Sequence, residues 1–162
     1  MFFYKKMESP ISTLYIVCDE NSLASILFCK QELMERFGDK VLTLAADHPM
    51  CLEVEKQLTE YFNGDRTEFS LPIQLNGTPF QVDVWNALSK IPYGSVRSYK
   101  EIAEEINKPL AVRAVGQANK RNSFPIVIPC HRVIGKNNTL VGYAGDKVGM
   151  KEKLLILEGV LH

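Results

Sequence analysis

One cysteine in this sequence lies in a setting typical of a chemical nucleophile. Cys130 follows a short apolar run bracketed by prolines, FPIVIP at residues 124–129, and precedes His131 and Arg132 directly. A free thiol is mostly protonated at neutral pH, so a reactive cysteine needs a nearby base or positive charge, which histidine and arginine can supply. A Cys-His pair is more often structural than catalytic, so the pair by itself leaves both interpretations open.

The other cysteines indicate neither a metal site nor a disulfide framework. Cys18, Cys29 and Cys51 show no C-x-x-C spacing with one another or with Cys130, and a chain of 162 residues can bury a core without covalent links. Reduced thiols and no structural metal are therefore expected.

Composition and the N-terminal residues favour a cytoplasmic protein with no membrane partner. The chain is 46% hydrophobic and 23% charged, and no apolar run approaches the length of a membrane-spanning helix. The first ten residues carry Lys5, Lys6 and Glu8 and no long apolar segment, so no secretory signal is expected.

The charge is unevenly distributed along the chain, although its net value is zero. Residues 1–75 hold twelve acids and seven bases, whereas residues 95–136 hold eight bases and three acids. This asymmetry favours a nucleic-acid-binding face in the second half, with a solvated helix surface as the alternative.

The first part of the chain predicts a small α/β unit. Residues 11–17 and 23–28 are rich in strand-forming residues and are separated by polar turn residues, which favours a hairpin. Residues 49–62 show helical spacing of apolar residues and end at Asn-Gly. His48, just before this helix, is expected to be a cap or a surface residue and not a ligand, and residues 65–77 are expected to form a linker.

The second part predicts helices with clear start signals. TPFQ at residues 78–81 and SYKE at residues 98–101 are capping boxes, each opening a helix. The second of these helices must end before Pro109, which is itself suited to begin a third helix through Lys120. Two short helices joined by a tight turn indicate a helix-turn-helix.

The third predicted helix has a surface suited to close approach. Small residues leave part of it nearly without side chains: Ala111, Ala114, Gly116 and Ala118. Arg113, Gln117 and Lys120 fall at i, i+4 and i+7 on a polar stripe. The helix is expected either to approach DNA closely or to pack tightly on a neighbouring helix.

The segment around Cys130, IPCHRV at residues 128–133, resembles the signature of the O6-alkylguanine-DNA alkyltransferase family. Further stretches resemble the family in the same order: PFQ at 79–81 with VW at 84–85, IPYG at 91–94, SY at 98–99 with IA at 102–103, RAVG at 113–116 with Ala118 and Asn122, GYAG at 142–145, and LL at 154–155 with EG at 158–159. They cover residues 76–159, roughly half of the chain. The first 75 residues match only in general character.

The resemblance implies a fold and a reaction. It implies a small α/β N-terminal domain, residues 1–75, and a mostly helical C-terminal domain, residues 76–162, that holds a winged-helix-like helix-turn-helix DNA-binding motif and the active site. It implies direct-reversal DNA repair, in which the alkyl group of O6-alkylguanine in double-stranded DNA moves irreversibly to Cys130, once per molecule. O4-alkylthymine stays open as a second substrate. No metal or other cofactor is implied, and the protein is expected to be a monomer.

The resemblance also assigns roles to individual residues. Cys130 resembles the alkyl acceptor, His131 its water-linked base, and Glu158 the carboxylate that orients this histidine. Asn122 resembles the residue that braces the active-site turn.

Other residues resemble the family's DNA and base contacts. Arg113 is similar to the finger that enters the duplex where the damaged base has left, and Tyr99 to the residue that turns the flipped nucleotide's phosphate and touches the base. Lys100 and Lys136 are expected to contact phosphates. The alkylguanine pocket is expected to be formed by Tyr99, Val133, Tyr143, Ala144 and Gly145, together with the carbonyl groups of Cys130 and Val133.

The sequence departs from the family pattern at one place. Between Tyr143 and Glu158 it has one residue more than the commonest spacing, and Asp146 occupies the position of a second glycine. The departure leaves open the register of residues 145–150 and the shape of the pocket rim.

Three other functions are compatible with parts of the sequence. An alkylated-base-binding protein without transferase activity resembles the family but typically has tryptophan at the cysteine's position, so Cys130 argues against it. A helix-turn-helix regulator would bind a palindromic site as a dimer. A cysteine hydrolase would need turnover and an oxyanion hole.

Overall fold

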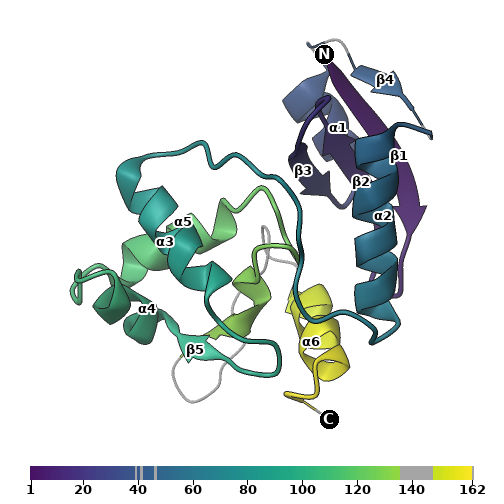
Figure 1. The fold of residues 1–162 in the computed structure, drawn as a ribbon. Helices are drawn as coiled ribbons and strands as arrows, with labels where there is room; N and C mark the ends of the chain where they lie inside the picture. The colour runs from purple at the N-terminus through teal and green to yellow at the C-terminus, as the bar shows by residue number, and fades with distance from the viewer. Residues whose placement is uncertain (39, 41, 46, 136–147, 162) are drawn as a thin grey trace. The chain divides into compact units, whose positions relative to one another are not determined.

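A computed structural model describes the chain except for residues 39, 41, 46, 136–147 and 162. The chain divides into two units, Met1–Gln74 and Leu75–His162, each of which is described by itself (Figure 1). As the sequence predicts, the N-terminal unit is built on a sheet and the C-terminal unit is mostly helical.

The N-terminal unit is built on a four-stranded sheet in the order β3-β2-β1-β4. Strands β2 (Thr13–Cys18) and β3 (Leu23–Leu27) form the predicted antiparallel hairpin. Strand β1 (Phe2–Glu8) pairs antiparallel with β2, and β4 (Leu42–Leu44) runs parallel to β1. The sequence did not predict β1, because only Met7 in it is fully buried and the inside-outside alternation is therefore weak.

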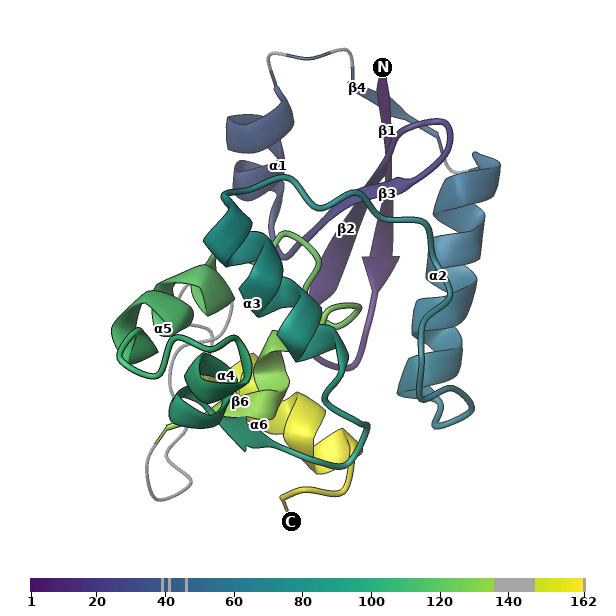
Figure 2. The same ribbon diagram turned by 60° about the vertical axis from the view of Figure 1, so that its left-hand side comes forward.

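Two helices cover opposite faces of this sheet, as Figure 2 shows. Helix α1 (Lys30–Phe37), also not predicted, buries Leu33 and Phe37 in a cluster with Val17 and Leu27. Helix α2 (Pro49–Phe62) packs on β1, β2 and β3 and has the predicted bounds.

His48 is the cap of α2, as expected. Its Nδ1 accepts a hydrogen bond from the Met50 amide at 3.3 Å, which satisfies one of the amides that a helix start leaves without a helical partner.

The C-terminal unit gathers short helices around a turn. Its elements are α3 (Pro79–Ser89), β5 (Arg97–Ser98), α4 (Tyr99–Glu105), α5 (Val112–Lys120), the 3-10 turn η1 (Cys130–Arg132), β6 (Val133–Ile134) and α6 (Val148–Leu157). Helices α3, α4 and α5 pack on one another, while α6 contacts η1 (Figure 1). Strands β5 and β6 pair in parallel, so α4 begins directly beside the strand that follows the Cys130 turn.

Both predicted capping boxes are present. The Gln81 amide donates to Thr78 Oγ1 at 3.1 Å, and the Thr78 amide donates to Gln81 Oε1 at 3.0 Å. Ser98 and Glu101 make the same reciprocal pair at 3.0 and 2.9 Å. Each cap stabilises its helix by about 1 kcal/mol and fixes where the helix begins.

Helix α5 begins at Val112, and the predicted start at Pro109 is wrong. The Lys108 amide donates to the Ala103 carbonyl at 2.9 Å and the Ala111 amide to the Lys108 carbonyl at 2.9 Å, so Pro109 lies in a turn between the two helices. The Lys108 hydrogen bond ends α4, and Pro109 lies outside both α4 and α5.

The small residues on α5 are divided between the core and the surface. Ala118 is 3% exposed and belongs to the core, whereas Ala114 is exposed beside Arg113 and Gln117. Only part of the small-residue surface is therefore open to a ligand.

None of the helices among the described residues has the length and apolar character needed to span a bilayer.

Candidate active site

The backbone that carries Cys130 is held in a strained turn. Ile126 has a φ of 75°, a left-handed conformation that a β-branched residue rarely adopts. Asn122 stabilises the turn at both ends, because its Nδ2 donates to the Ile128 carbonyl at 2.9 Å and its Oδ1 accepts from the Phe124 amide at 2.9 Å. This is the geometry that a brace of the active-site turn requires.

Two neighbouring helices fix Cys130 itself. The Asn119 side chain on α5 donates to the Cys130 carbonyl at 3.3 Å, and the indole of Trp85 on α3 donates to the Ala118 carbonyl at 2.9 Å. The Cys130 carbonyl also accepts from the Val133 amide. Both of its lone pairs are thus used by hydrogen bonds within the protein.

Glu158, one residue after α6, binds both residues that follow the cysteine. His131 Nε2 lies 2.7 Å from Glu158 Oε2, while Arg132 donates to both carboxylate oxygens at 2.8 and 3.0 Å. Arg132 also donates to the Ile91 carbonyl at 2.7 Å. All three side chains are buried, so their hydrogen bonds must replace the lost hydration.

Burial lowers the pKa of His131, although the hydrogen bond to Glu158 opposes this effect. A neutral imidazole that faces a carboxylate carries its proton on the nitrogen that points at the carboxylate. Nε2 is therefore the protonated nitrogen, and Nδ1 is the nitrogen that can accept a proton.

Burial favours the neutral thiol form of Cys130 over the thiolate. Cys130 is 0% exposed, and this burial raises its pKa to about 11, against the lowering effects of a hydrogen bond from Asn122 and of the positive charge on Lys151. The adjacent histidine and arginine thus do not ionise the cysteine in advance, and a base must take its proton during the reaction.

Lys151 is a buried charge in the site that sequence reasoning missed. It is 0% exposed, its Nζ lies 5.8 Å from the centre of the Tyr99 ring, and burial lowers its pKa to about 8, against the raising effect of Cys130. The residues at 151, 154, 155 and 158 fall at i, i+3, i+4 and i+7 and are all buried, so helical spacing could have revealed it. Its neighbours Glu152 and Lys153 are exposed, so the charged run 151–153 does not by itself mark Lys151 as buried.

Tyr99 is the first residue of α4, and its ring lies over α5. A Cβ added to Gly116 would lie 3.9 Å from the Tyr99 ring carbons, an ordinary contact. Burial, and then the charge of Cys130, raise the pKa of Tyr99 to about 12. Its hydroxyl therefore stays protonated and can donate a hydrogen bond.

The structure separates the remaining predicted residues into three groups. Lys100 and Arg113 are exposed, on α4 and α5. Val133 is buried in β6, one turn from Cys130. Lys136, Tyr143, Ala144 and Gly145 lie outside the described residues, as do residues 145–147 of the segment 145–150.

No group of three or more His, Cys, Asp or Glu side chains within the described part of the chain could hold a metal ion.

Both units match models of one protein family. Residues 2–75 match the model described as 6-O-methylguanine DNA methyltransferase, ribonuclease-like domain. Residues 79–160 match the model described as 6-O-methylguanine DNA methyltransferase, DNA binding domain.

Among curated proteins, the constitutive methylated-DNA--protein-cysteine methyltransferase of Bacillus subtilis is 46% identical over 100% of this chain and 98% of the relative. The inducible one from the same organism is 52% identical over 93% and 80%.

Solved structures agree with these matches. The O6-methylguanine methyltransferase of Mycobacterium tuberculosis superposes with a TM-score of 0.86 at 40% identity, over 98% of this chain and 93% of that one. A crystal structure of Mycobacterium tuberculosis OGT in complex with DNA gives 0.86 at 39% identity, over 96% and 92%. The chain belongs to the 6-O-methylguanine DNA methyltransferase family, because both domain models match it and it covers most of the length of its curated relatives.

Proposed function

We propose that this chain is a methylated-DNA--protein-cysteine methyltransferase that repairs O6-alkylguanine in double-stranded DNA by direct reversal. The observation that carries the proposal is a buried cysteine on a braced turn, followed by a histidine whose ring is hydrogen-bonded to a buried carboxylate. The names of its relatives and the DNA complex of one of them support the same activity and DNA as the partner. Residues 76–162 are assigned both DNA binding and alkyl transfer.

The proposed reaction moves one alkyl group and one proton. His131 Nδ1 takes the Cys130 thiol proton through a water molecule, and the sulfur attacks the alkyl carbon in line with the bond to O6. The carbon–oxygen bond breaks, its electron pair stays on guanine, and a thioether forms. A thioether has no easy reverse step, so each molecule acts once.

The guanine anion needs stabilisation at the moment it leaves. Tyr99, kept protonated by its raised pKa, is suited to donate a hydrogen bond to it. Tyr99, Val133, Tyr143, Ala144 and Gly145 are proposed to line the base pocket, and Lys100 and Lys136 to contact phosphates. We assign no metal or cofactor, and expect a cytoplasmic monomer.

Mass spectrometry tests the reaction. A duplex oligonucleotide with one O6-methylguanine is expected to add one methyl group to the protein, on Cys130, with a stoichiometry near one and no turnover. Cys130→Ser is the matched negative control, since it keeps the polar side chain and removes the nucleophile. A label on Cys18, Cys29 or Cys51, or repeated turnover, would contradict the single-use mechanism. Tight binding of the lesion without any mass increase would instead identify an alkylated-base-binding protein.

Arg113→Ala is expected to slow repair of duplex DNA by about tenfold to a hundredfold, because extrusion of the base costs a few kcal/mol and Arg113 is proposed to fill the gap it leaves. Dealkylation of free O6-benzylguanine needs no extrusion and should change far less. Single-turnover rates on both substrates give the comparison.

The control is Arg121→Ala, which removes another exposed arginine, at the end of α5. If Arg113→Ala slowed both substrates equally, the residue would support the pocket or the fold, and its assignment as a finger would be wrong.

A further inference from the structure

The turn between α4 and α5 holds an apolar side chain fully out in solvent. Leu110 is 99% exposed, more than any of the other exposed large hydrophobic residues among those described, whose values run from 38% to 69%. Val112, the first residue of α5, is 38% exposed beside it. Single exposed leucines are common on proteins, so exposure by itself assigns no function.

The backbone under Leu110 is ordered by hydrogen bonds on both sides. The Ala111 amide donates to the Lys108 carbonyl at 2.9 Å, the Val115 amide donates to the Ala111 carbonyl at 2.9 Å, and Pro109 fixes its own φ. Asn107 closes α4 in the left-handed conformation, with a φ of 62°. Leu110 is therefore presented by a rigid turn.

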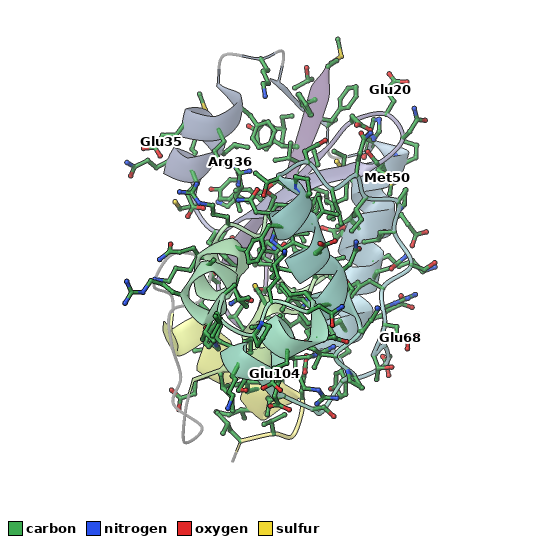
Figure 3. The ribbon with its side chains drawn as sticks, turned by 90° about the vertical axis from the view of Figure 1, so that its left-hand side faces the viewer. Glu20, Glu35, Arg36, Met50, Glu68 and Glu104 are labelled. Atoms are coloured by element: carbon green, nitrogen blue, oxygen red, sulfur yellow. The ribbon has the colours of Figure 1, made fainter. Side chains whose placement is uncertain are left out.

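The charges around Leu110 favour a polyanion as the molecule that covers it. Lys108 and Leu110 line the same shallow hollow, and Arg113 is exposed one helical turn further along the chain. Helix α5 itself contains no acidic residue. The acidic residues of the motif lie on α4, including the exposed Glu104 labelled in Figure 3.

We propose that Leu110 is an apolar contact to the deoxyribose and base edges of duplex DNA, set by the turn beside Arg113. Proteins that deform DNA use leucine, among other apolar residues, as a wedge against base steps. The proposal rests on the proposed function, because it extends the surface assigned to DNA to the exposed start of α5. On this surface, cationic side chains would bind phosphates and Leu110 would contact the interior of the groove.

The test separates apolar from ionic binding by its salt dependence. In a Cys130→Ser background, which prevents reaction, the dissociation constant for an O6-methylguanine duplex is measured between low and physiological salt. Leu110→Ala is expected to weaken binding about tenfold at every salt concentration. An apolar contact neutralises no phosphate, so its loss does not change the number of counterions that binding releases. Lys108→Ala is expected to flatten the log–log slope by about one unit.

Leu52→Ala is the matched control, since Leu52 is 42% exposed on α2 of the N-terminal unit, and it should change neither quantity. Thermal unfolding checks that each variant is folded, which is expected for Leu110→Ala because the side chain makes almost no buried contact. An unchanged dissociation constant, a loss confined to low salt, or a change of oligomeric state in place of DNA affinity would each overturn the proposal. Failure of methyl transfer by the wild-type protein would instead refute the proposed function, so the two failures are distinguishable.

Discussion

Glu158→Gln is expected to lower the free energy of unfolding of the C-terminal unit by about 3–5 kcal/mol, the usual cost of removing one partner from a buried ion pair. Glu158 is the carboxylate that both Arg132 and His131 contact, and a neutral amide would leave the guanidinium of Arg132 buried without a compensating charge. Alkyl transfer should slow as well, because the carboxylate orients His131. The variant is therefore a structural change as much as a catalytic one.

Urea denaturation followed by tryptophan fluorescence measures this loss. Trp85 is the single tryptophan and lies on α3, so its signal reports the C-terminal unit. Glu152→Gln, at an exposed position of α6, is the control and should change the free energy of unfolding little. Equal unfolding midpoints for the wild type and Glu158→Gln would contradict the role of Glu158 as the common partner.

Lys151→Met is expected to have the opposite effect on stability and the same effect on the reaction. Burial lowers the pKa of Lys151 to about 8 from its ordinary value of 10.5, so at pH 7 the folded protein keeps an ammonium that burial disfavours. Removing it should raise the free energy of unfolding at pH 7 by a few kcal/mol, on the order of 1.4 kcal/mol for each unit of depression. Methionine fills a similar volume without charge.

The pH dependence gives the sign of the effect. The lowered pKa penalises the folded state fully below about pH 8, and the penalty disappears as the pH rises above 10.5, where the lysine is neutral in both folded and unfolded protein. The stability difference between Lys151→Met and the wild type should therefore shrink between these two values. Lys153→Met, at an exposed position, is the control. A constant difference across this range would contradict a buried ammonium.

Alkyl transfer by Lys151→Met should be slower, because the positive charge on Lys151 lowers the pKa of Cys130. Single-turnover rates measured from neutral to alkaline pH should show that the variant needs a higher pH to reach a given rate. A variant that is more stable and equally fast would show that Lys151 has no part in activating the thiol.

The sequence predicted those parts of the fold that local signals control. The two capping boxes place the starts of α3 and α4, because the side chain that marks each start is also the group that binds the backbone there. The start of α5 was predicted wrongly. Pro109 suits a helix start as well as it suits a turn, and the hydrogen bonds of the Lys108 and Ala111 amides form the turn.

The burial of the site's side chains could not be predicted from their residue types. Cys130 beside His131 and Arg132 indicated a thiol ionised by its neighbours, yet the structure turns Arg132 and His131 towards Glu158 and leaves desolvation to dominate at the sulfur. Lys151 was not predicted as a site residue, because its residue type does not reveal its burial. Its place in the site depends on the packing of α6 against η1.

The complete burial of Cys130 also determines how long each molecule stays usable. Peroxides and small electrophiles react with cysteines that are both exposed and ionised, and burial opposes both conditions at Cys130. A protein that uses one thiol once can no longer repair DNA if that thiol is oxidised before the protein binds a lesion. Burial therefore protects this single thiol from oxidation before a lesion is bound.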